Sequence, residues 1–387
     1  MNHHNSYHAK TFKGLERILA RELEDLGAEN ISIGNRGVDF SGGKSMLYKT
    51  NFCLRTALRI LVPWFSYRAQ NENQLYKEIR KIDWSQVLDV HKTFMIDPVV
   101  FSSIFRNSQY VALRIKDAIV DQFRSETGLR PSVDRNQPDL RINVHVNQDR
   151  FLISLDSSGD PLFKRGYRKN AHAAPLNEVL AAGMILLTGW NGQKPFIDPM
   201  CGSGTLAIEA ALIAAGIPPG VFRKGFAFEK WKDYDNNLFT RVIETLPQEK
   251  RLQVPIYAFD IDEASTKLAR DNILSAELQD YISVEKRDFL TPEEVFSPSV
   301  MVINPPYGER IGGAEIQMLY KRIGDALKKS YPGSEAWILS ASKEGMKQLG
   351  LKAERKITLY NGALECKYQK FRLFDGTFKE YKKNSAQ

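Results

Sequence analysis

The chain has 387 residues and a formal net charge of +8; 43% of its residues are hydrophobic and 26% are charged. These fractions are those of a globular protein, so they exclude wholesale disorder, and the length accommodates two or three domains. No apolar run approaches the ~20 residues of a membrane span, and the N-terminus lacks the pattern of a secretory signal. We therefore expect a cytoplasmic protein with no membrane partner.

Three cysteines, Cys53, Cys201 and Cys366, are scattered along the chain. None has zinc-ligand or redox spacing, so we expect neither a disulfide framework nor a metal site. Cys201 is most simply a small buried residue. The basic surplus hints at a polyanionic partner, although many basic proteins bind no nucleic acid.

The first 165 residues have the mixed periodicities of an α+β module. Apolar residues three and four apart indicate helices, and alternating apolar and polar residues indicate strands, with Pro63 marking an edge or a bulge. The predicted helices cover residues 12–26, 45–56, 75–82 and 111–123, and the predicted strands cover 31–33, 37–40, 58–67, 93–96, 99–105, 140–146 and 151–155, the last two forming a hairpin.

Beyond a turn-rich break at residues 157–161, strands and helices alternate. This alternation predicts a doubly wound parallel sheet. The expected strands cover residues 195–198, 256–259, 282–284, 300–303 and 337–339; the expected helices cover 175–190, 205–215, 263–278 and 319–329; residues 351–360 and 364–374 form a closing antiparallel pair.

A glycine loop follows the first of these strands. Gly202 and Gly204 remove side chains where a ligand must approach the backbone, and the helix that follows offers free N–H groups. Asp198 ends the strand, where a carboxylate can meet an ammonium group, and Asp260 ends the next strand, where an acid can hold ribose hydroxyls. Because the gap between these acids exceeds the ~20 residues of a dinucleotide fingerprint, a nicotinamide cofactor is disfavoured.

A second motif, Asn304-Pro305-Pro306-Tyr307, follows the strand at 300–303. A planar amine attached to a ring is a poor nucleophile because its lone pair is shared. The Asn304 side-chain oxygen and the Pro305 carbonyl can accept hydrogen bonds from such an amine and stabilise the positive charge that builds on its nitrogen. Tyr307 supplies a flat face for stacking a base that has left its helix.

Together, these motifs resemble those of class I S-adenosylmethionine-dependent methyltransferases. The whole chain resembles the THUMP-domain RNA guanine-N2 methyltransferases, especially the bacterial large-subunit rRNA type, and the sequences at 166–168, 174–178 and 187–190 resemble the lead into their catalytic domain. The resemblance implies an α/β fold, in which a Rossmann-like seven-stranded methyltransferase domain follows an α+β ferredoxin-like and THUMP module. The implied domains are residues 1–65 (ferredoxin-like), 66–165 (THUMP) and 166–387 (methyltransferase).

The resemblance also assigns roles to residues, with S-adenosylmethionine as the cofactor. It implies that the methionine part is surrounded by Asp198, Gly202, Gly204 and Thr205, and that Ala174 and Pro175 flank the cofactor. It implies that Asp260 binds the ribose with Asp262 nearby, and that Asp288 meets the adenine amine. The target amine is implied to be held by Asn304, Pro305, Pro306 and Tyr307. Two alternatives stay open: Asp262 can instead cap the following helix, and Asp288 can be a solvated loop acid.

Two basic segments have two interpretations each. Residues 216–252 look like an insertion, whose aromatic and basic residues contact RNA or, in the interpretation that we favour, form an amphipathic cover over the sheet. Residues 164–169, at the domain junction, contact the RNA backbone or form a solvated linker.

The predicted function is transfer of a methyl group from S-adenosylmethionine to the exocyclic N2 of a guanine in 23S (large-subunit) rRNA. The sequence leaves tRNA open as the substrate, and it leaves the oligomeric state open. A DNA adenine or protein glutamine N-methyltransferase is an alternative, since the Asn304 motif serves any planar amine. A non-catalytic RNA-binding assembly factor is another, and the intact motifs argue against it.

Overall fold

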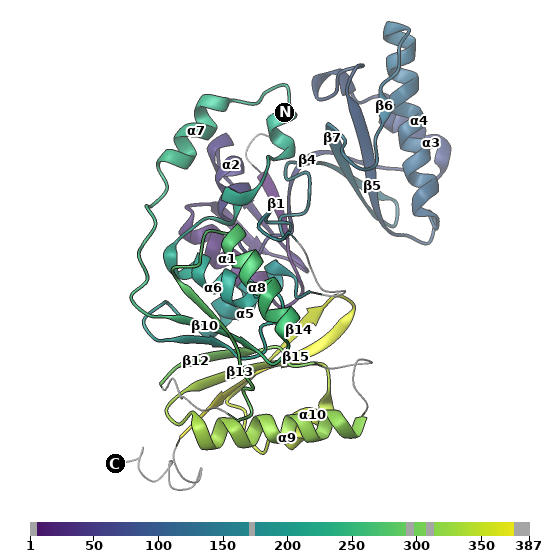
Figure 1. Cartoon of the computed structure of the whole chain (residues 1–387). Coiled ribbons are helices and arrows are strands. Elements are labelled where there is room, and N and C mark those ends of the chain that lie inside the picture. The colour runs from purple at the N-terminus through teal and green to yellow at the C-terminus, as the bar shows by residue number, and fades with distance from the viewer. Residues whose placement is uncertain (1–5, 170–174, 292–297, 307–312, 375–387) are drawn as a thin grey trace. The chain divides into compact units, whose positions relative to one another are not determined.

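The computed structural model describes residues 6–169, 175–291, 298–306 and 313–374 (Figure 1). The chain divides into two compact units. Unit 1 comprises Met1–Thr11, Ala20–Leu162 and Arg223–Leu246, and unit 2 comprises Phe12–Leu19, Phe163–Phe222 and Pro247–Gln387. The predicted domain boundaries at residues 65 and 165 stay predictions.

An eight-stranded sheet, in the order β2-β3-β1-β4-β8-β7-β5-β6, runs through unit 1. The long strand β4 pairs with β1 near its start and with β8 along its length, so it joins the two halves of the sheet. The elements are β1 (Ser6–Lys10), α1 (Glu16–Asp25), β2 (Glu29–Ile33), β3 (Gly37–Ser41), α2 (Lys44–Cys53), β4 (Arg59–Arg68), α3 (Glu72–Arg80), β5 (Thr93–Phe101), α4 (Ser108–Thr127), β6 (Ser132–Val133), β7 (Leu140–Asn147) and β8 (Arg150–Asp156).

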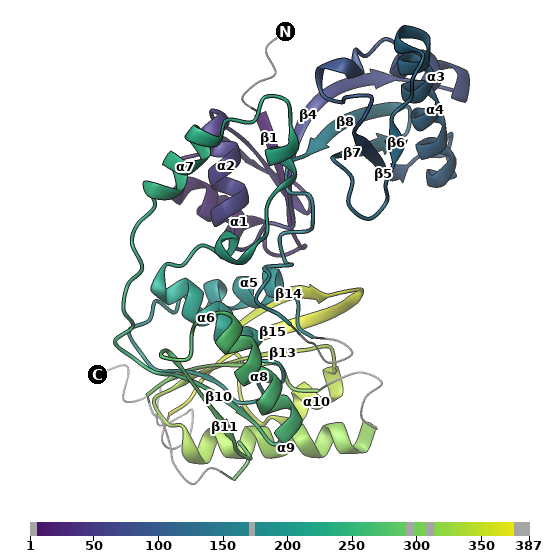
Figure 2. The same cartoon turned by 45° about the horizontal axis from the view of Figure 1, so that its top comes forward.

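The second half of this sheet carries α3 and α4 side by side on one face (Figures 1 and 2). Their apolar positions pack against alternate residues of the strands, as the helical and strand periodicities predict. The core there includes Leu75, Ile79, Val111, Ile115, Ile119, Phe94, Ile142 and Val144, each of which is buried. The predicted hairpin at 140–155 is confirmed, and the register of β4 against β8 shifts between Pro63 and Phe65, so this proline marks a bulge.

The segment Arg223–Leu246 belongs to unit 1, although it directly follows Phe163–Phe222 of unit 2 in the chain. Phe228 stacks on Tyr48 with ring centroids 4.6 Å apart and on Phe226 at 5.2 Å. Trp231 packs against the core of the second half-sheet, and Lys230 pairs with Asp139 at 3.2 Å. The expected cover over the catalytic sheet is therefore wrong for these residues, because their aromatic side chains fill the core of unit 1.

Unit 2 is built on a seven-stranded sheet in the order β11-β10-β9-β12-β13-β15-β14, so the predicted α/β class is confirmed. Strands β11 to β13 are parallel to one another, whereas β15 runs antiparallel to β13 and β14. The elements are α5 (Glu178–Thr188), β9 (Phe196–Asp198), α6 (Thr205–Ala215), β10 (Ile256–Asp260), α8 (Glu263–Ser275), β11 (Ile282–Lys286), β12 (Val300–Ile303), α9 (Gly313–Ser330), β13 (Glu335–Ser340), α10 (Lys343–Gln348), β14 (Arg355–Asn361) and β15 (Leu364–Arg372).

Helices cover both faces of this sheet. Figures 1 and 2 show α5, α6 and α8 on one face and α9 with α10 on the other. The chain steps outward from β9 through β10 to β11 and then returns to β12 beside β9, so the order reverses between β9 and β12. Sheets of this kind bind ligands beyond the carboxyl ends of the strands at such a point of reversal.

Some elements differ from the sequence predictions. The strands expected at 93–96 and 99–105 form the single strand β5, which continues through Pro98 because β7 pairs with it along its whole length. β6 covers only its first residues, Thr93 and Phe94, so the proline lies where the sheet has an edge. The strands β1 and β6, the helix α10 and the helix α7 (Asn236–Glu244) have no counterpart in the predictions.

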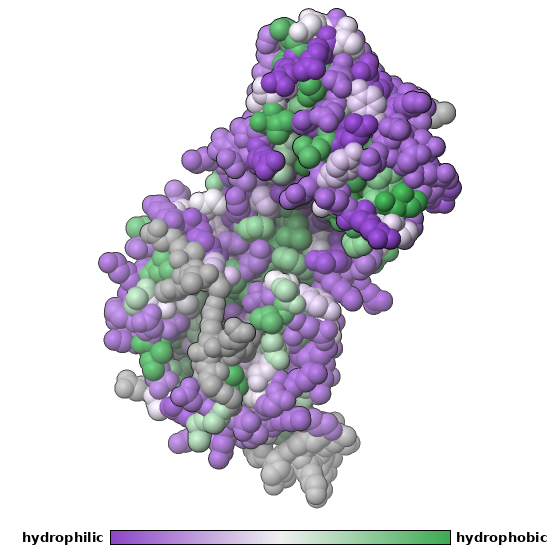
Figure 3. Space-filling model, turned by 90° about the vertical axis from the view of Figure 1, so that its right-hand side faces the viewer, coloured by the Kyte–Doolittle hydropathy of each residue, from purple (hydrophilic) through white to green (hydrophobic). Residues whose placement is uncertain are grey.

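The surface fits the composition. The face in Figure 3 is mainly hydrophilic, with hydrophobic residues in scattered groups. Among the described residues, no helix is both long and apolar enough to cross a membrane.

Candidate cofactor and catalytic site

A cavity of about 1040 Å³ lies within unit 2, where the carboxyl ends of β9, β10 and β12 meet. The sequence motifs follow these strands, and parallel strands bring their carboxyl ends to one edge. Nine predicted site residues line the cavity: Pro175, Gly202, Thr205, Asp260, Asp262, Asp288, Asn304, Pro305 and Pro306. Asp198 and Gly204 are not among the lining residues, and Ala174 and Tyr307 lie outside the described residues.

The glycine loop takes a shape that only glycines adopt easily. Gly202 has a φ of 53° and Gly204 a φ of 81°, both in the left-handed region. A Cβ at Gly204 would come within 3.2 Å of the Cβ of Ala269 on α8, whereas one at Gly202 would meet no atom within 4 Å. Gly204 therefore lets the loop pack closely on α8, and Gly202 supplies the turn at the cavity wall.

Asp260 joins the glycine loop to the end of β10. Its Oδ2 accepts a hydrogen bond of 2.8 Å from the backbone N–H of Gly202, and its Oδ1 accepts one of 3.0 Å from the N–H of Asp262. A carboxylate has further acceptor positions, so the predicted contact with ribose hydroxyls stays possible beside these bonds.

Asp262 caps the helix α8. Its Oδ2 accepts a hydrogen bond from the backbone N–H of Ser265 at 2.9 Å and from the hydroxyl of the same residue at 2.8 Å. The alternative of a helix cap is thus confirmed, and the residue also lines the cavity. A contact between Asp262 and the cofactor remains a prediction.

Asp198 is fully buried at the end of β9. Burial, reinforced by the nearby charge of Asp260, raises the pKa of its carboxyl well above the usual value, although the N–H groups of Met200 and Ala207 lower it slightly. Within the described part of the chain, neither carboxylate oxygen has a hydrogen bond of good geometry. A buried carboxylate with so few hydrogen bonds favours a cationic group. The contact of Asp198 with a ligand's ammonium stays a prediction, because Asp198 is not among the residues that line the cavity.

Asn304 follows β12 and has a buried side-chain oxygen. Among the residues that the structure describes, none donates a hydrogen bond to its Oδ1, and the residue lines the cavity with Pro305 and Pro306. An acceptor that is withheld from water and from the protein is prepared to receive a donor from a ligand.

The far end of the cavity contains charged residues that the sequence analysis missed. Arg287 lies with its guanidinium 4.6 Å from the ring centre of Phe259, and Arg322 on α9 lies 3.8 Å from Oδ2 of Asp288. Asp288 also accepts a 2.9 Å hydrogen bond from the N–H of Leu290, so it is not merely a solvated acid. Both arginines line the cavity, and the adjacency of Arg287 to Asp288 is the one signal that the sequence offered.

The positions of the β14–β15 hairpin tip and of Arg165 were also not predicted from the sequence. The tip of the β14–β15 hairpin, with Asn361, Gly362 and Leu364, forms part of the cavity wall. Arg165 is buried rather than solvated, so neither interpretation of the basic segment 164–169 holds for it.

The seven-stranded sheet, the glycine loop and the acids at its carboxyl edge together define a class I methyltransferase. Three family models match the chain in succession: the RlmL ferredoxin-like domain at residues 6–61, the THUMP domain at 69–156 and the RMKL-like methyltransferase domain at 165–370. The chain therefore belongs to the RMKL-like methyltransferase family and has a THUMP domain ahead of its catalytic domain.

Known proteins resemble the chain along most of its length. A Synechocystis protein named "Putative RNA methyltransferase slr0064" is 38% identical over 371 residues, or 95% of this chain and 97% of that protein. The Ribosomal RNA large subunit methyltransferase K/L of Photobacterium profundum is 36% identical over 97% of this chain but 54% of its own length, so the chain spans about half of that relative. The crystal structure of SMU.472 complexed with SAH has a TM-score of 0.85 at 30% identity, covering 96% of this chain and 99% of that one.

The protein is accordingly an S-adenosylmethionine-dependent methyltransferase. The residues at the cavity fit this cofactor. Gly202 leaves the loop backbone open beside the cavity, and the carboxylate of Asp260 lines it. Asp198 is a buried acid that is not among the lining residues, so its contact with the ammonium group stays a prediction. Which residues hold each part of the cofactor stays a prediction.

Proposed function

We propose that the protein methylates the exocyclic N2 of a guanine in RNA and that its substrate is large-subunit rRNA. The observation that carries the amine chemistry is the buried Oδ1 of Asn304, which has no partner among the described residues at the end of β12. Such an oxygen accepts a hydrogen bond from a planar amine and holds the nitrogen lone pair toward the methyl donor.

The reaction needs alignment more than activation. When bound, S-adenosylmethionine would supply a methyl group on a sulfonium: the C–S bond to that methyl would break as the amine nitrogen forms the new C–N bond, and the proton of the methylated amine would pass to water. In this proposal, Asn304 and the Pro305 carbonyl hold the amine, and stacking on the base is assigned to Tyr307 by the family resemblance alone, since Tyr307 lies outside the described residues. Fixing the two reactants in line supplies most of the rate enhancement.

A cysteine nucleophile has no part in this proposal. Burial raises the pKa of the Cys201 thiol, and the charges of Asp198 and Asp260 raise it further. The thiol therefore stays protonated near neutral pH, and a protonated thiol is a poor nucleophile. Direct transfer from the sulfonium to the amine is consistent with this state.

The support for an RNA substrate comes from the N-terminal half of the chain. The THUMP match covers residues 69–156, and the K/L relatives are named as methyltransferases of large-subunit ribosomal RNA. A folded module of this size suits recognition of structured RNA by its shape and phosphates. The choice of guanine N2 follows the family resemblance and is the part that the experiment must test first.

Substitution of Asn304 by alanine tests the amine site. We expect the methyl-transfer rate to fall about 10²–10³-fold, the usual cost of one transition-state hydrogen-bonding group, while the affinity for S-adenosylmethionine changes less than about twofold. The matched control is Asn191→Ala, since Asn191 is an exposed loop residue outside the cavity. Full activity of the Asn304 variant would reject the assigned role.

The substrate is tested separately. The purified protein is given S-adenosylmethionine and either 23S rRNA, bulk tRNA or duplex DNA, each from a strain that lacks the gene, and the digested nucleosides are identified by mass spectrometry. The proposal expects N2-methylguanosine from 23S rRNA alone. Methylation of tRNA alone or N6-methyladenine in DNA would replace it with one of the alternatives.

A further inference from the structure

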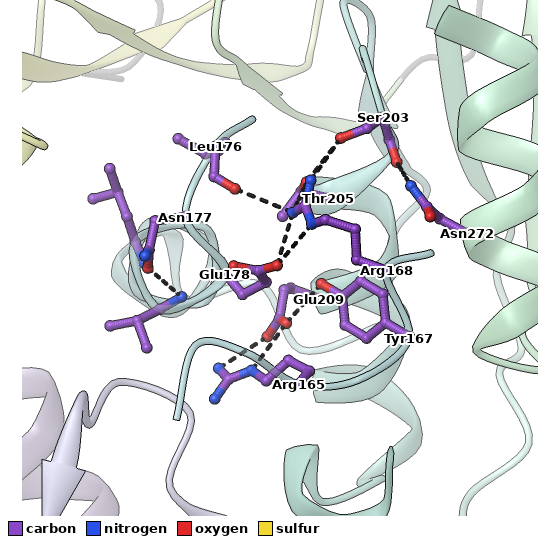
Figure 4. Close-up of polar contacts among 12 residues, drawn as sticks. Arg165, Tyr167, Arg168, Leu176, Asn177, Glu178, Ser203, Thr205, Glu209 and Asn272 are labelled. Atoms are coloured by element: carbon purple, nitrogen blue, oxygen red, sulfur yellow. Dashed lines mark hydrogen bonds and ion pairs between the residues drawn. The ribbon is translucent and has the colours of Figure 1, made fainter. Parts of the chain in front are cut away.

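Arg168 lies at the centre of a polar network beside the cavity (Figure 4). Its Nε donates to Glu178 at 2.9 Å, and its Nη1 donates to the hydroxyl of Ser203 at 3.1 Å. Its Nη2 donates to the hydroxyl of Thr205 at 2.9 Å and to the carbonyl of Leu176 at 3.3 Å. One guanidinium thus reaches four residues.

These four residues come from two parts of the chain. Leu176 and Glu178 lie at the start of α5, whereas Ser203 and Thr205 form the end of the glycine loop and the start of α6. Leu176, Ser203 and Thr205 all line the cavity, but Arg168 does not. Among the described residues, Arg168 is therefore linked to the cavity through the residues that it holds.

A second contact fixes the same loop from the other side. Asn272 on α8 is buried, and its Nδ2 donates a 3.0 Å hydrogen bond to the carbonyl of Ser203. Its Oδ1 accepts a 3.3 Å hydrogen bond from the N–H of Lys169, the neighbour of Arg168. Ser203 is thus held at its hydroxyl and at its carbonyl by one continuous network.

The geometry of arginine suits this task better than that of lysine. The guanidinium presents five N–H donors in a rigid plane, so it can address acceptors on both sides at fixed angles. A lysine ammonium keeps the charge opposite Glu178 but cannot span the same acceptors from one position. The substitution Arg168→Lys therefore separates the charge from the geometry.

A neighbouring pair offers a matched comparison. Arg165 is buried and pairs with Glu209 on α6, with its Nε 3.3 Å from Oε1, and the hydroxyl of Tyr167 donates to the same oxygen at 3.1 Å. None of these three residues lines the cavity. The Arg165 pair anchors the middle of α6, and its hydrogen bonds to Glu209 involve none of the cavity-lining residues that Arg168 holds.

We propose that Arg168 is a positioning residue for S-adenosylmethionine: it holds Leu176 and the Ser203–Thr205 end of the glycine loop in the arrangement that binds the cofactor. The proposal depends on the use of this cofactor and not on the identity of the methylated nucleotide. Its test needs no RNA, so its failure and the failure of the proposed substrate are distinguishable.

The experiment compares Arg168→Lys with Arg165→Lys in the full chain. Affinity for S-adenosylmethionine is measured by calorimetry and stability by thermal unfolding. We expect Arg168→Lys to weaken binding about tenfold, the equivalent of losing one hydrogen bond to a charged group, with a smaller change in melting temperature than Arg165→Lys. Arg165→Lys should lower the melting temperature and leave the affinity within about twofold. Unchanged affinity in Arg168→Lys would overturn the proposal.

A double-mutant cycle with Thr205→Val tests the route of the effect and remains informative if Arg168→Lys folds poorly. If Arg168 acts through Thr205, the double variant binds S-adenosylmethionine more tightly than the product of the two single losses predicts. Independent, multiplicative losses would overturn the proposal. Ser203→Ala, which leaves the Arg168–Glu178 pair in place, should also weaken binding, and an unchanged affinity would argue against the loop as the route.

Discussion

The backbone N–H of Gly202 donates a hydrogen bond of 2.8 Å to Oδ2 of Asp260. This bond joins the loop after β9 to the end of β10, two neighbouring parallel strands. The carboxylate that is predicted to bind the ribose thus also fixes the glycine that leaves room for the cofactor. Cofactor affinity should depend on Asp260 in two ways, through the ligand contact and through the loop.

Replacing Asp260 with asparagine should weaken S-adenosylmethionine binding by about tenfold or more. An amide has one acceptor oxygen and one NH2 group, so it cannot accept from the N–H groups of Gly202 and Asp262 through both of its atoms as the carboxylate does. Calorimetry measures the change in affinity. Wild-type affinity in this variant would contradict the role of Asp260.

Asp262→Ala serves as the neighbouring control and is a prediction of its own. The variant loses the cap of α8, which should lower the free energy of unfolding by about 1 kcal/mol. Because its side chain is engaged with Ser265, its loss should affect cofactor affinity less than the loss of the Asp260 carboxylate. Urea unfolding and calorimetry on the same preparation separate the two effects, and Asp262→Ser, which keeps a capping oxygen, should restore stability.

The carboxyl of Asp198 should make stability depend on pH. Since burial raises its pKa in the folded state, the folded protein holds this proton more tightly than the unfolded chain. The stabilisation is present below the unfolded pKa, ~4, and is lost as pH rises toward the folded pKa. Without cofactor, Asp198→Asn should therefore gain stability relative to wild type as pH rises from 4 to 8.

S-adenosylmethionine should reverse this difference, because an ammonium beside Asp198 favours the ionised carboxylate. The stability difference between Asp198→Asn and wild type is measured by thermal unfolding at pH 5 and pH 8, with and without S-adenosylmethionine. The difference between variant and wild type removes the contribution of other buried acids such as Glu22 and Asp156. A pH-independent difference would refute the predicted state of Asp198.

Phe228→Ala tests the packing of the segment 223–246 on unit 1. Phe228 is 1% exposed and stacks on Tyr48, so truncation should cost about 3–5 kcal/mol of stability. Phe101 is 62% exposed in the same unit, and its change to alanine provides the matched control with a much smaller loss. Denaturant unfolding measures both variants, and equal effects would contradict the packing.

The sequence predicted the cofactor loop and the amine motif because both lie directly after strands. Local pattern alone identified Asp198, Gly202 and Asn304 as candidates. The parallel sheet places all three after or at the carboxyl ends of β9 and β12, and Gly202 and Asn304 line the cavity there. By contrast, Arg168 lay in a basic segment that the sequence analysis interpreted as an RNA contact or a solvated linker. Its proposed role depends on a hydrogen bond to Thr205, 37 positions further along the chain, and no local pattern records such a pair.

The sequence likewise did not show which unit the segment 223–246 packs on. Its aromatic residues signalled burial, but hydrophobic burial is non-directional and does not specify which core receives them. Tyr48 and Phe52 of unit 1 became their partners through tertiary packing.

The sequence by itself thus determined the class of the fold and the family, and it named the candidate residues at the strand ends, since periodicity and short motifs are local properties. Only the tertiary structure decided which charges are buried, that Asp262 caps α8, and that Arg322 and the β14–β15 hairpin complete the cavity. Those features arise from contacts between segments far apart in the chain. Their stability depends on complementary partners rather than on the preference of any one segment.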